Sequence, residues 1–248
     1  MRAVLVQATP VEGDLEGNLA AACTAIETSD ADLVAFPEMF LGGYRIRRLQ
    51  PVPADALARV GAAARAAGVT VVIGGPEAVD GGLANTAWVF APDGDLAGVY
   101  RKTHLFGAER GAIVAGGELA PIEVAGRRLG VMICFDVEFP EVARTLALRG
   151  AEVLVTISAN MEPFEDDHDA FVRARALENE RPHLYVNRTG SEASAVFVGR
   201  SQAVDAEGRV LAMAGAGPET LAAELPAPGR RDERTQYLAQ RRPELYNR

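Results

Sequence analysis

Three residues of this chain combine the groups needed for nucleophilic catalysis: a thiol, a carboxylate and an ammonium. Cys134 ends the apolar run 130–133 and comes just before a predicted helix start, and Glu38 and Lys102 each follow a further strand-like run. A strand end holds a side chain in place, and the N–H groups that follow favour negative charge on sulfur. The three residues therefore form a candidate catalytic site at one edge of a sheet.

Each of these residues also has an ordinary structural interpretation. A free cysteine is usually a small buried apolar residue. Glu38 follows Pro37 and could lie exposed at a turn, and Lys102 adjoins Arg101 and could belong to a solvated basic pair. Residue type alone does not decide between these interpretations and catalysis.

The segments around the three residues resemble the signatures of the nitrilase superfamily of carbon–nitrogen hydrolases. Glu38 and Lys102 are 64 positions apart, and Lys102 and Cys134 are 32 apart. The matching segments are Phe36-Pro37-Glu38, Tyr100-Arg101-Lys102-Thr103-His104-Leu105-Phe106 and Ile133-Cys134-Phe135-Asp136, with later matches at 158–161, 173–179 and 199–201. The resemblance covers almost the whole chain and is closest to aliphatic amidases of the 5-aminopentanamidase or R-stereoselective amidase type.

The resemblance implies amide hydrolysis through a thioester. Cys134 would attack the carbonyl carbon, and Glu38 would accept the thiol proton, pass it to the leaving ammonia and then activate water. Lys102 and the backbone N–H of Phe135 would stabilise the oxyanion. A carboxylate can act in this way only if burial raises its pKa, which apolar neighbours such as Phe40 favour.

The family also carries a second glutamate after the catalytic lysine, and Glu109 is the candidate, although the loop here is one residue shorter than in the relatives. Tyr44, Glu138 and Asn160 join Phe135 as candidates for substrate or oxyanion binding. The implied substrate is a small linear amide that could carry an amino group, and neither a cofactor nor a metal is expected. The carboxylates that could attract an ammonium, or simply form a solvated acidic loop, are Glu138, Glu162, Glu165, Asp166 and Asp167.

Related chemistry on the same triad remains open. An N-carbamoyl amino acid or amine hydrolase, an ω-amidase and a nitrilase would all use these residues and would differ only in their products. Acyl transfer from the thioester to an amine is a further alternative. A non-catalytic binding protein on this fold is another.

Other residues of catalytic type have structural explanations. The tripeptide Phe-Pro-Glu recurs at 139–141, where Pro140 and Glu141 suit a helix start. His168 lies among acids and is predicted to be a surface residue or helix cap. His183 is predicted to be structural, and His104 is predicted to support the Lys102 loop.

Composition sets the class of protein. The chain has 248 residues, 48% of them hydrophobic, and a net charge of −9. One domain over 1–248 is expected, and the negative charge argues against nucleic acid or an anionic membrane as partner. The two cysteines are no disulfide framework, and no run predicts a signal peptide or a membrane span. A cytoplasmic protein is expected.

Strand-like and helical runs alternate in both halves of the chain. The pattern suggests two sheets with helices outside, and the resemblance implies the four-layer α-β-β-α sandwich of the superfamily. Runs 195–204 and 210–214 are predicted to form a hairpin, and 103–118 is predicted to be a loop over the site. The charged tail from about 226 is expected to be solvated or at a subunit interface, since the family implies a homodimer or a higher homo-oligomer.

Overall fold

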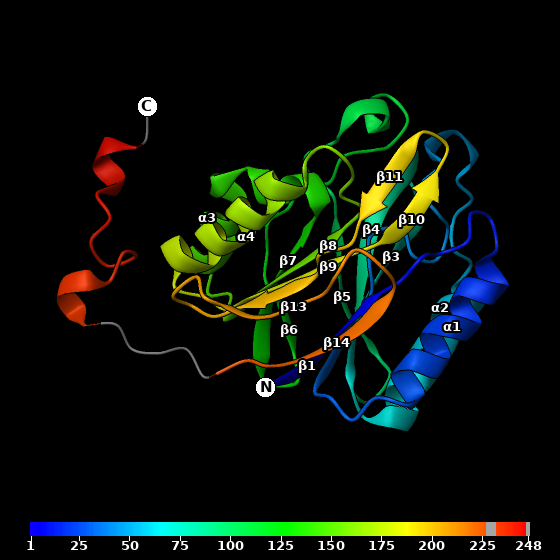
Figure 1. Ribbon diagram of the computed structural model, residues 1–248, viewed down its shortest axis with the longest axis horizontal. Helices are drawn as coiled ribbons and strands as arrows, with labels where there is room; N and C mark the ends of the chain where they lie inside the picture. Colours follow the sequence, from blue (N-terminus) through cyan, green and yellow to red (C-terminus); the bar gives the residue numbers. More distant parts are fainter. Residues whose placement is uncertain (227–231, 247–248) are drawn as a thin grey trace.

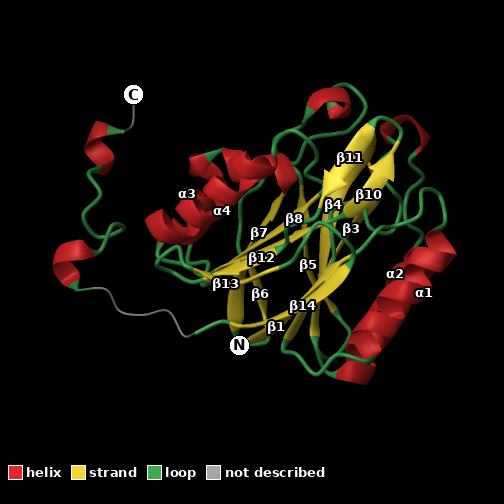
Figure 2. Ribbon diagram, in the orientation of Figure 1, coloured by secondary structure: helices red, strands yellow, loops and turns green. Residues whose placement is uncertain are grey.

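Two six-stranded sheets pack face to face, with helices on their outer sides, in a computed structural model that describes residues 1–226 and 232–246 (Figure 1, Figure 2). The expected α-β-β-α sandwich is confirmed. The first sheet has the order β14-β1-β2-β3-β4-β5. Its strands are β1 (Arg2–Gln7), β2 (Leu33–Ala35), β3 (Thr70–Val79), β4 (Gly82–Phe90), β5 (Leu96–Arg101) and β14 (Glu219–Glu224).

The second sheet repeats the arrangement with the order β13-β12-β9-β8-β7-β6. Its inner strands β7, β8 and β9 run parallel, as β1, β2 and β3 do in the first sheet. Its strands are β6 (Ile122–Val124), β7 (Arg127–Ile133), β8 (Val153–Ser158), β9 (His183–Asn187), β12 (Gln202–Val204) and β13 (Val210–Met213).

Each outer face of the sandwich is covered by two helices. Helices α1 (Leu15–Glu27) and α2 (Ala54–Ala67) pack on the first sheet, and α3 (Pro140–Leu148) and α4 (Glu165–Asn179) pack on the second. Local sequence fixes their ends: Asp14 accepts a hydrogen bond from the N–H of Gly17, and α2 stops at Gly68 in the left-handed conformation. Within the described residues, no helix is long and apolar enough to cross a membrane.

The main core lies between the two sheets. Alternate residues of the inner strands face it, among them Leu5 and Val72 from the first sheet and Val131 and Val155 from the second. Burial on both faces explains why the inner strands are continuous apolar runs. The packing places the ends of β2, β5 and β7 together, and these are the strand ends that carry the candidate residues.

The hairpin predicted between 195–204 and 210–214 is confirmed for β12 and β13, which pair antiparallel, but the run 195–204 is not one strand. This run is divided between β11 (Ala195–Val198) and β12, because Gly199 and Arg200 both adopt a positive φ, of 65° and 59°. Strand β11 pairs instead with β10 (Thr189–Glu192), which forms a separate two-stranded sheet and was not predicted. Strand β14 was also not predicted.

Short 3₁₀ helices complete the chain: η1 (Ile46–Arg48), η2 (Gly107–Glu109), η3 (Cys134–Glu138), η4 (Glu233–Thr235) and η5 (Pro243–Leu245). The described part of the tail lies to one side of the sandwich (Figure 1). The predicted solvated or subunit-contacting tail begins at about 226, and its residues 227–231, which include Arg230 and Arg231, fall outside the described residues.

Candidate active site

Glu38 is fully buried just beyond the end of β2. Its Oε1 accepts hydrogen bonds from Asn85 Nδ2 at 2.6 Å and from Lys102 Nζ at 2.8 Å. Its Oε2 is buried and has no hydrogen-bond partner among the residues that the structure describes. One oxygen of this carboxylate is therefore fixed, and the other is left to accept a proton.

Lys102 follows β5 and is also fully buried. Its Nζ lies between two carboxylates, 2.8 Å from Glu38 and 2.9 Å from Glu109. Glu109 is held by three neutral donors: Phe106 N–H donates to its Oε2 at 2.8 Å, and Asn85 Nδ2 and Tyr44 OH donate to its Oε1 at 3.0 Å and 3.4 Å. The structure thus brings Glu109 next to Lys102 despite the shorter loop.

Cys134 is the first residue of η3, directly after β7. Its φ of +45° is unusual for a residue with a side chain and turns the backbone sharply at the strand end. The side chain is 7% exposed and lies against the interface of the two sheets. The site is therefore assembled across that interface, with Glu38, Lys102 and Glu109 from one side and the thiol from the other.

Burial and charge together set the protonation of the three groups. Burial raises the pKa of Glu38, and the nearby Lys102 offsets this rise only in part. Burial alone would lower the pKa of Lys102, but Glu38 and Glu109 outweigh it and the pKa lies well above its usual value. Burial and the charge of Glu38 raise the pKa of the Cys134 thiol. At neutral pH this favours a neutral thiol beside a proton acceptor of raised affinity and a charged lysine.

Asp136 connects the nucleophile to the lysine strand, and the sequence analysis did not single it out. Its buried carboxylate accepts hydrogen bonds from Tyr100 OH and Thr103 Oγ1, both at 2.8 Å, from His104 N–H at 2.9 Å and from Ile133 N–H at 3.0 Å. The sequence signal was an aspartate two residues after a strand-end cysteine, because aspartate readily accepts backbone N–H groups in turns. His104 supports the Lys102 loop through this contact, in line with its prediction.

A narrow cavity leads to the thiol. It has a volume of about 10 Å³, room for about one water molecule. The residues predicted to bind substrate or the oxyanion, Tyr44, Phe135, Glu138 and Asn160, all line it with Cys134. The remaining lining residues are mostly apolar: Phe106, Ala159, Met161, Phe164 and His168.

The structure contradicts the prediction that His168 is a surface residue or a helix cap. It lies within α4, is 2% exposed, and its ring contacts Tyr185 and Glu138. Helix α4 turns this position toward the sheet, whereas the acids around it face outward. His183 is buried and bonded to Thr156, as a structural residue should be.

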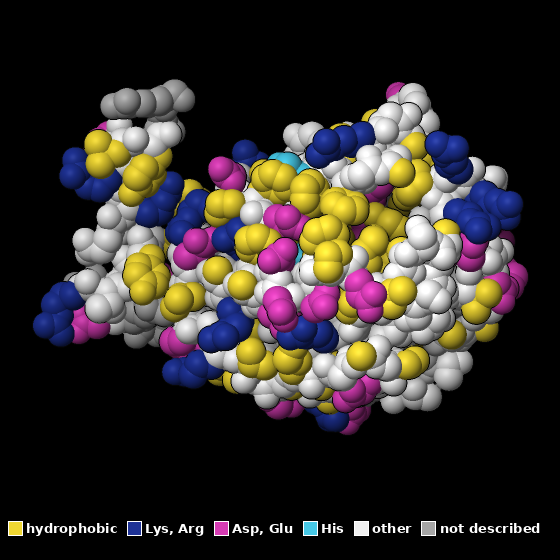
Figure 3. Space-filling model, turned by 45° about the horizontal axis from the view of Figure 1, so that its top comes forward, with side chains coloured by type: hydrophobic (Ala, Val, Ile, Leu, Met, Phe, Trp, Pro, Cys, Tyr) yellow, Lys and Arg dark blue, Asp and Glu magenta, His cyan; other side chains and the backbone are white. Residues whose placement is uncertain are grey.

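The other predicted acids lie away from the thiol cavity. Glu162 and Glu165 line a separate open cavity, and Asp166 pairs with Arg200. Glu141 is exposed in the first turn of α3. With the top of the molecule turned forward, acidic side chains are seen scattered among a group of apolar ones (Figure 3).

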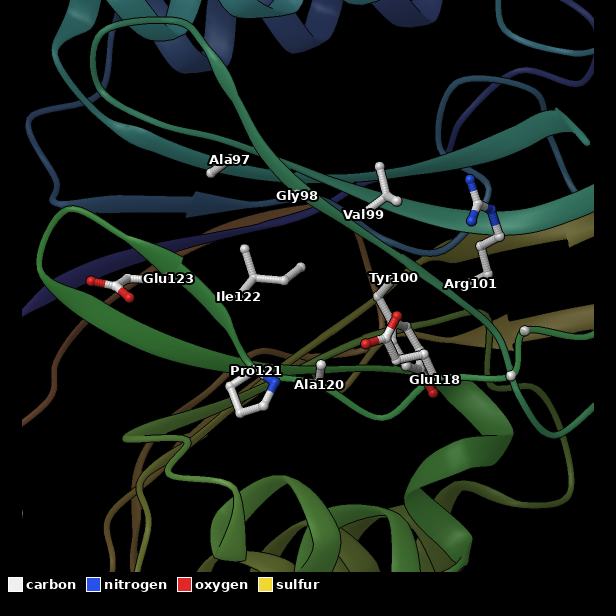
Figure 4. Close-up of a pocket in the computed structure, with 12 residues that line it drawn as sticks. Ala97, Gly98, Val99, Tyr100, Arg101, Glu118, Ala120, Pro121, Ile122 and Glu123 are labelled. Carbon is white, nitrogen blue, oxygen red and sulfur yellow. The ribbon is translucent and has the colours of Figure 1, made fainter.

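A larger cavity of about 260 Å³ lies between β5 and β6 (Figure 4). Its wall includes Tyr100, Arg101 and Ile122, and none of Glu38, Lys102 and Cys134 lines it. Arg101 is engaged by Glu77, with its Nε 2.6 Å from a carboxylate oxygen. This cavity is therefore separate from the candidate active site.

Comparison with known proteins identifies the family. A hydrolase encoded in the pqqF 5′ region of Pseudomonas protegens is 39% identical over 100% of this chain and 91% of its own length. An (R)-stereoselective amidase from a Pseudomonas species is 38% identical over 87% of this chain and 81% of its own length. A mutant of the Nesterenkonia sp. AN1 amidase with acrylamide added at its active-site cysteine superposes with a TM-score of 0.87, at 30% identity over 99% of this chain and 98% of that one.

The Nesterenkonia amidase has the same fold, and the carbon–nitrogen hydrolase family model matches residues 2–232. An enzyme of this class acts on amides. The chain belongs to the carbon–nitrogen hydrolase family, within the nitrilase superfamily.

Proposed function

We propose that this enzyme hydrolyses a small linear carboxamide to a carboxylate and ammonia through a thioester on Cys134. The observation that carries the proposal is the buried Oε2 of Glu38, which has no partner in the described part of the chain, in a site that also holds the thiol and a charged lysine. Such an oxygen costs stability, and a catalytic role is one reason for a protein to keep it. Accepting the thiol proton is the use that fits its surroundings.

The reaction follows from these groups. Glu38 takes the proton from Cys134 as sulfur attacks the carbonyl carbon, and Lys102 with the Phe135 N–H stabilises the resulting oxyanion. Glu38 then gives the proton to the amide nitrogen, the C–N bond breaks, and ammonia leaves a thioester. Water next gives a proton to Glu38 and attacks the thioester, and the carboxylic acid leaves while the proton returns to sulfur.

Glu109 completes the charge balance of the site. Lys102 stays protonated because two carboxylates face it, so it can stabilise the oxyanion without losing its proton. Glu38 therefore shares its counter-ion with Glu109. This sharing helps to keep the proton affinity of Glu38 high enough for a base.

The residues that line the thiol cavity favour an unbranched substrate that carries an amino group, and the cavity would have to widen to admit it. Its aromatic walls suit a narrow aliphatic chain. Among the described lining residues, Glu138 is the one carboxylate, and a carboxylate beside apolar walls favours a cationic group. Glu138→Gln should therefore weaken hydrolysis of ω-amino amides about ten-fold and leave uncharged amides of equal length unaffected. Equal rates for the two substrates in the wild type would contradict this assignment.

Ammonia release from amides, N-carbamoyl amino acids and nitriles tests the proposal. Wild type should release ammonia from linear amides, and Cys134→Ala should release none. Carbamoyl compounds would also release carbon dioxide, and nitriles would consume two waters, so the products separate the alternatives. No Cys134-dependent release from any amide would overturn the proposal.

We also infer a cytoplasmic homo-oligomer. Two free cysteines suit a reducing compartment. The described tail exposes Tyr237, Leu245 and Tyr246, which would suit contact with a second subunit. Sedimentation of the full chain and of a chain ending at 226 tests this: only the full chain should exceed the monomer mass.

A further inference from the structure

A line of hydrogen bonds runs from the cavity wall to the residue beside the nucleophile, and the mechanism above does not use it. Ser158 is the last residue of β8, next to β7, and the register pairs Ile133 with Ile157. The residues that follow this pair are Cys134 and Ser158, so the two residues stand at the neighbouring ends of the two strands. Ser158 is fully buried.

The partners of Ser158 fix the direction of its own proton. Its Oγ accepts hydrogen bonds from Tyr185 OH at 3.0 Å and from Asn160 N–H at 3.2 Å, and the Asn160 N–H is shared with Asn187 Oδ1 at 2.8 Å. A hydroxyl has two acceptor positions and one proton. With both positions occupied, the Ser158 proton is left to donate, and the Ser158 side chain acts on the Cys134 thiol as a hydrogen-bond partner that lowers its pKa.

The same argument on donors and acceptors applies to His168. Tyr185 donates its one hydroxyl proton to Ser158, so its oxygen accepts a hydrogen bond from His168 Nδ1 at 2.8 Å. The other ring nitrogen of His168 is 3.3 Å from Glu138 Oε1, at the cavity wall. We call Ser158, Tyr185, His168 and Glu138 the polar chain. From His168 onward, each of its donors points toward Cys134.

We propose that Ser158 is a further catalytic residue, whose hydroxyl donates to the sulfur of Cys134 and stabilises the thiolate. Tyr185 and His168 are positioning residues that keep this hydroxyl in the role of donor. The proposal rests on the nucleophilic role of Cys134 proposed above. Negative charge reaches sulfur twice in each cycle, when Glu38 removes the thiol proton and when the thioester is cleaved. A donor at this position lowers the barrier of both steps.

Other charged and titratable groups also act on the thiol, and the test must leave them unchanged. Those that interact with it directly are Glu38, Lys102, Tyr44 and Tyr185, while Glu109 contacts Lys102, and His168 and Glu138 lie further along the polar chain. Ser158→Ala removes a neutral hydroxyl and none of these groups. Any change in thiolate content therefore reports on the hydrogen bond.

Strand β8 supplies a matched control. Thr156 lies two residues earlier, on the same face of the strand, and its buried hydroxyl is hydrogen-bonded to His183 Nε2 at 2.8 Å. Thr156→Ala removes a buried hydroxyl from the same strand and, although Thr156 pairs with Tyr185 in the sheet, none of the hydrogen bonds of the polar chain. It measures the effect of local destabilisation alone.

The experiment is the rate of alkylation of Cys134 by iodoacetamide against pH, in a Cys23→Ser background. Ser158→Ala and Tyr185→Phe should each slow alkylation about three- to ten-fold at a given pH, because a higher thiol pKa leaves less thiolate. Thr156→Ala should match the parent. For the amide substrate, kcat should fall in the same two variants while KM stays constant.

Alkylation of Ser158→Ala at the rate of Thr156→Ala over the whole pH range would overturn the proposal. Tyr185→Phe keeps the ring in place and serves as the test if Ser158→Ala does not fold. Alkylation needs no amide, so it separates the two proposals. If Ser158→Ala and Tyr185→Phe slow alkylation as expected but the wild type releases no ammonia from any amide, the proposed function is overturned and the hydrogen bond is not.

Discussion

The same tripeptide, Phe-Pro-Glu, occurs in two environments that give its glutamate two roles. Glu38 is enclosed after β2, where burial raises its pKa and one of its oxygens has no partner among the described residues. Glu141 is exposed in the first turn of α3, where its charge complements the helix dipole. Environment, and not local sequence, therefore decides which copy can be a base.

Glu38→Gln should lower kcat by at least about 10³-fold, because an amide cannot accept the thiol proton. Glu141→Gln should leave kcat within about two-fold and lower stability by about 0.5 kcal/mol. Ammonia release and urea unfolding of both variants check these values. Equal losses of activity in the two variants would contradict the assignment of Glu38.

Glu109→Ala should lower kcat by about 10²-fold, because it removes a counter-charge of Lys102 and leaves the N–H of Phe106 without its acceptor. Lys102 would then bind Glu38 more tightly and lower its proton affinity. Steady-state kinetics on a linear amide test this. If turnover and affinity both stay at wild-type values, Glu109 has no role in the site.

At the scale of elements, Asp136 is the residue that joins two of them. Its carboxylate accepts from Ile133 at the end of β7 and from Tyr100, Thr103 and His104 at the end of β5. The distance between the nucleophile turn and the lysine strand is therefore fixed by one buried side chain. Replacing Asp136 should therefore loosen both the turn that carries Cys134 and the strand end that carries Lys102.

Asp136→Ala should destabilise the fold by about 3 kcal/mol, because it leaves several buried donors without an acceptor. Asp205→Ala is the matched control, since Asp205 is also buried and accepts two backbone N–H groups, in the turn between β12 and β13. Urea unfolding and ammonia release should show loss of stability in both variants. Loss of activity in the folded protein should occur only for Asp136→Ala.

The sequence predicted the elements whose signal is local. The apolar run 130–133, which lies within β7, is an example. Strand β10 was not predicted, because its sequence Thr189-Gly190-Ser191-Glu192 is polar and the strand depends on pairing with β11. The burial of Asn85 was not predicted for a related reason. Only the folded site shows that the Asn85 amide donates hydrogen bonds to both Glu38 and Glu109. Contacts between distant segments leave no periodic trace in sequence.

At the scale of the whole molecule, one buried histidine links stability to pH. His183 lies in β9, and burial lowers its pKa from 6.5 to about 4. Its neutral form is satisfied on both sides, with Thr156 at one ring nitrogen and the carbonyl of Val172 at the other. The unfolded chain binds a proton at this site more readily than the folded chain does.

This contribution to stability is fully present above pH 6.5 and is lost as the pH falls from 6.5 toward 4, by about 3 kcal/mol in total. His183→Gln should be less stable at neutral pH and should lose less stability on acidification over this range. Urea unfolding at several pH values compares the two proteins. Parallel curves for wild type and variant would contradict a depressed pKa at His183.

The division of the site between the two sheets has a consequence for how the enzyme is made. Glu38 and Lys102 come from one layer and Cys134 from the other. A newly synthesised chain in which only one layer has formed carries either a base without a nucleophile or a thiol without a base. Hydrolysis therefore begins only when the layers dock. In a refolding experiment, recovery of activity would mark that docking more sharply than recovery of helix and strand content.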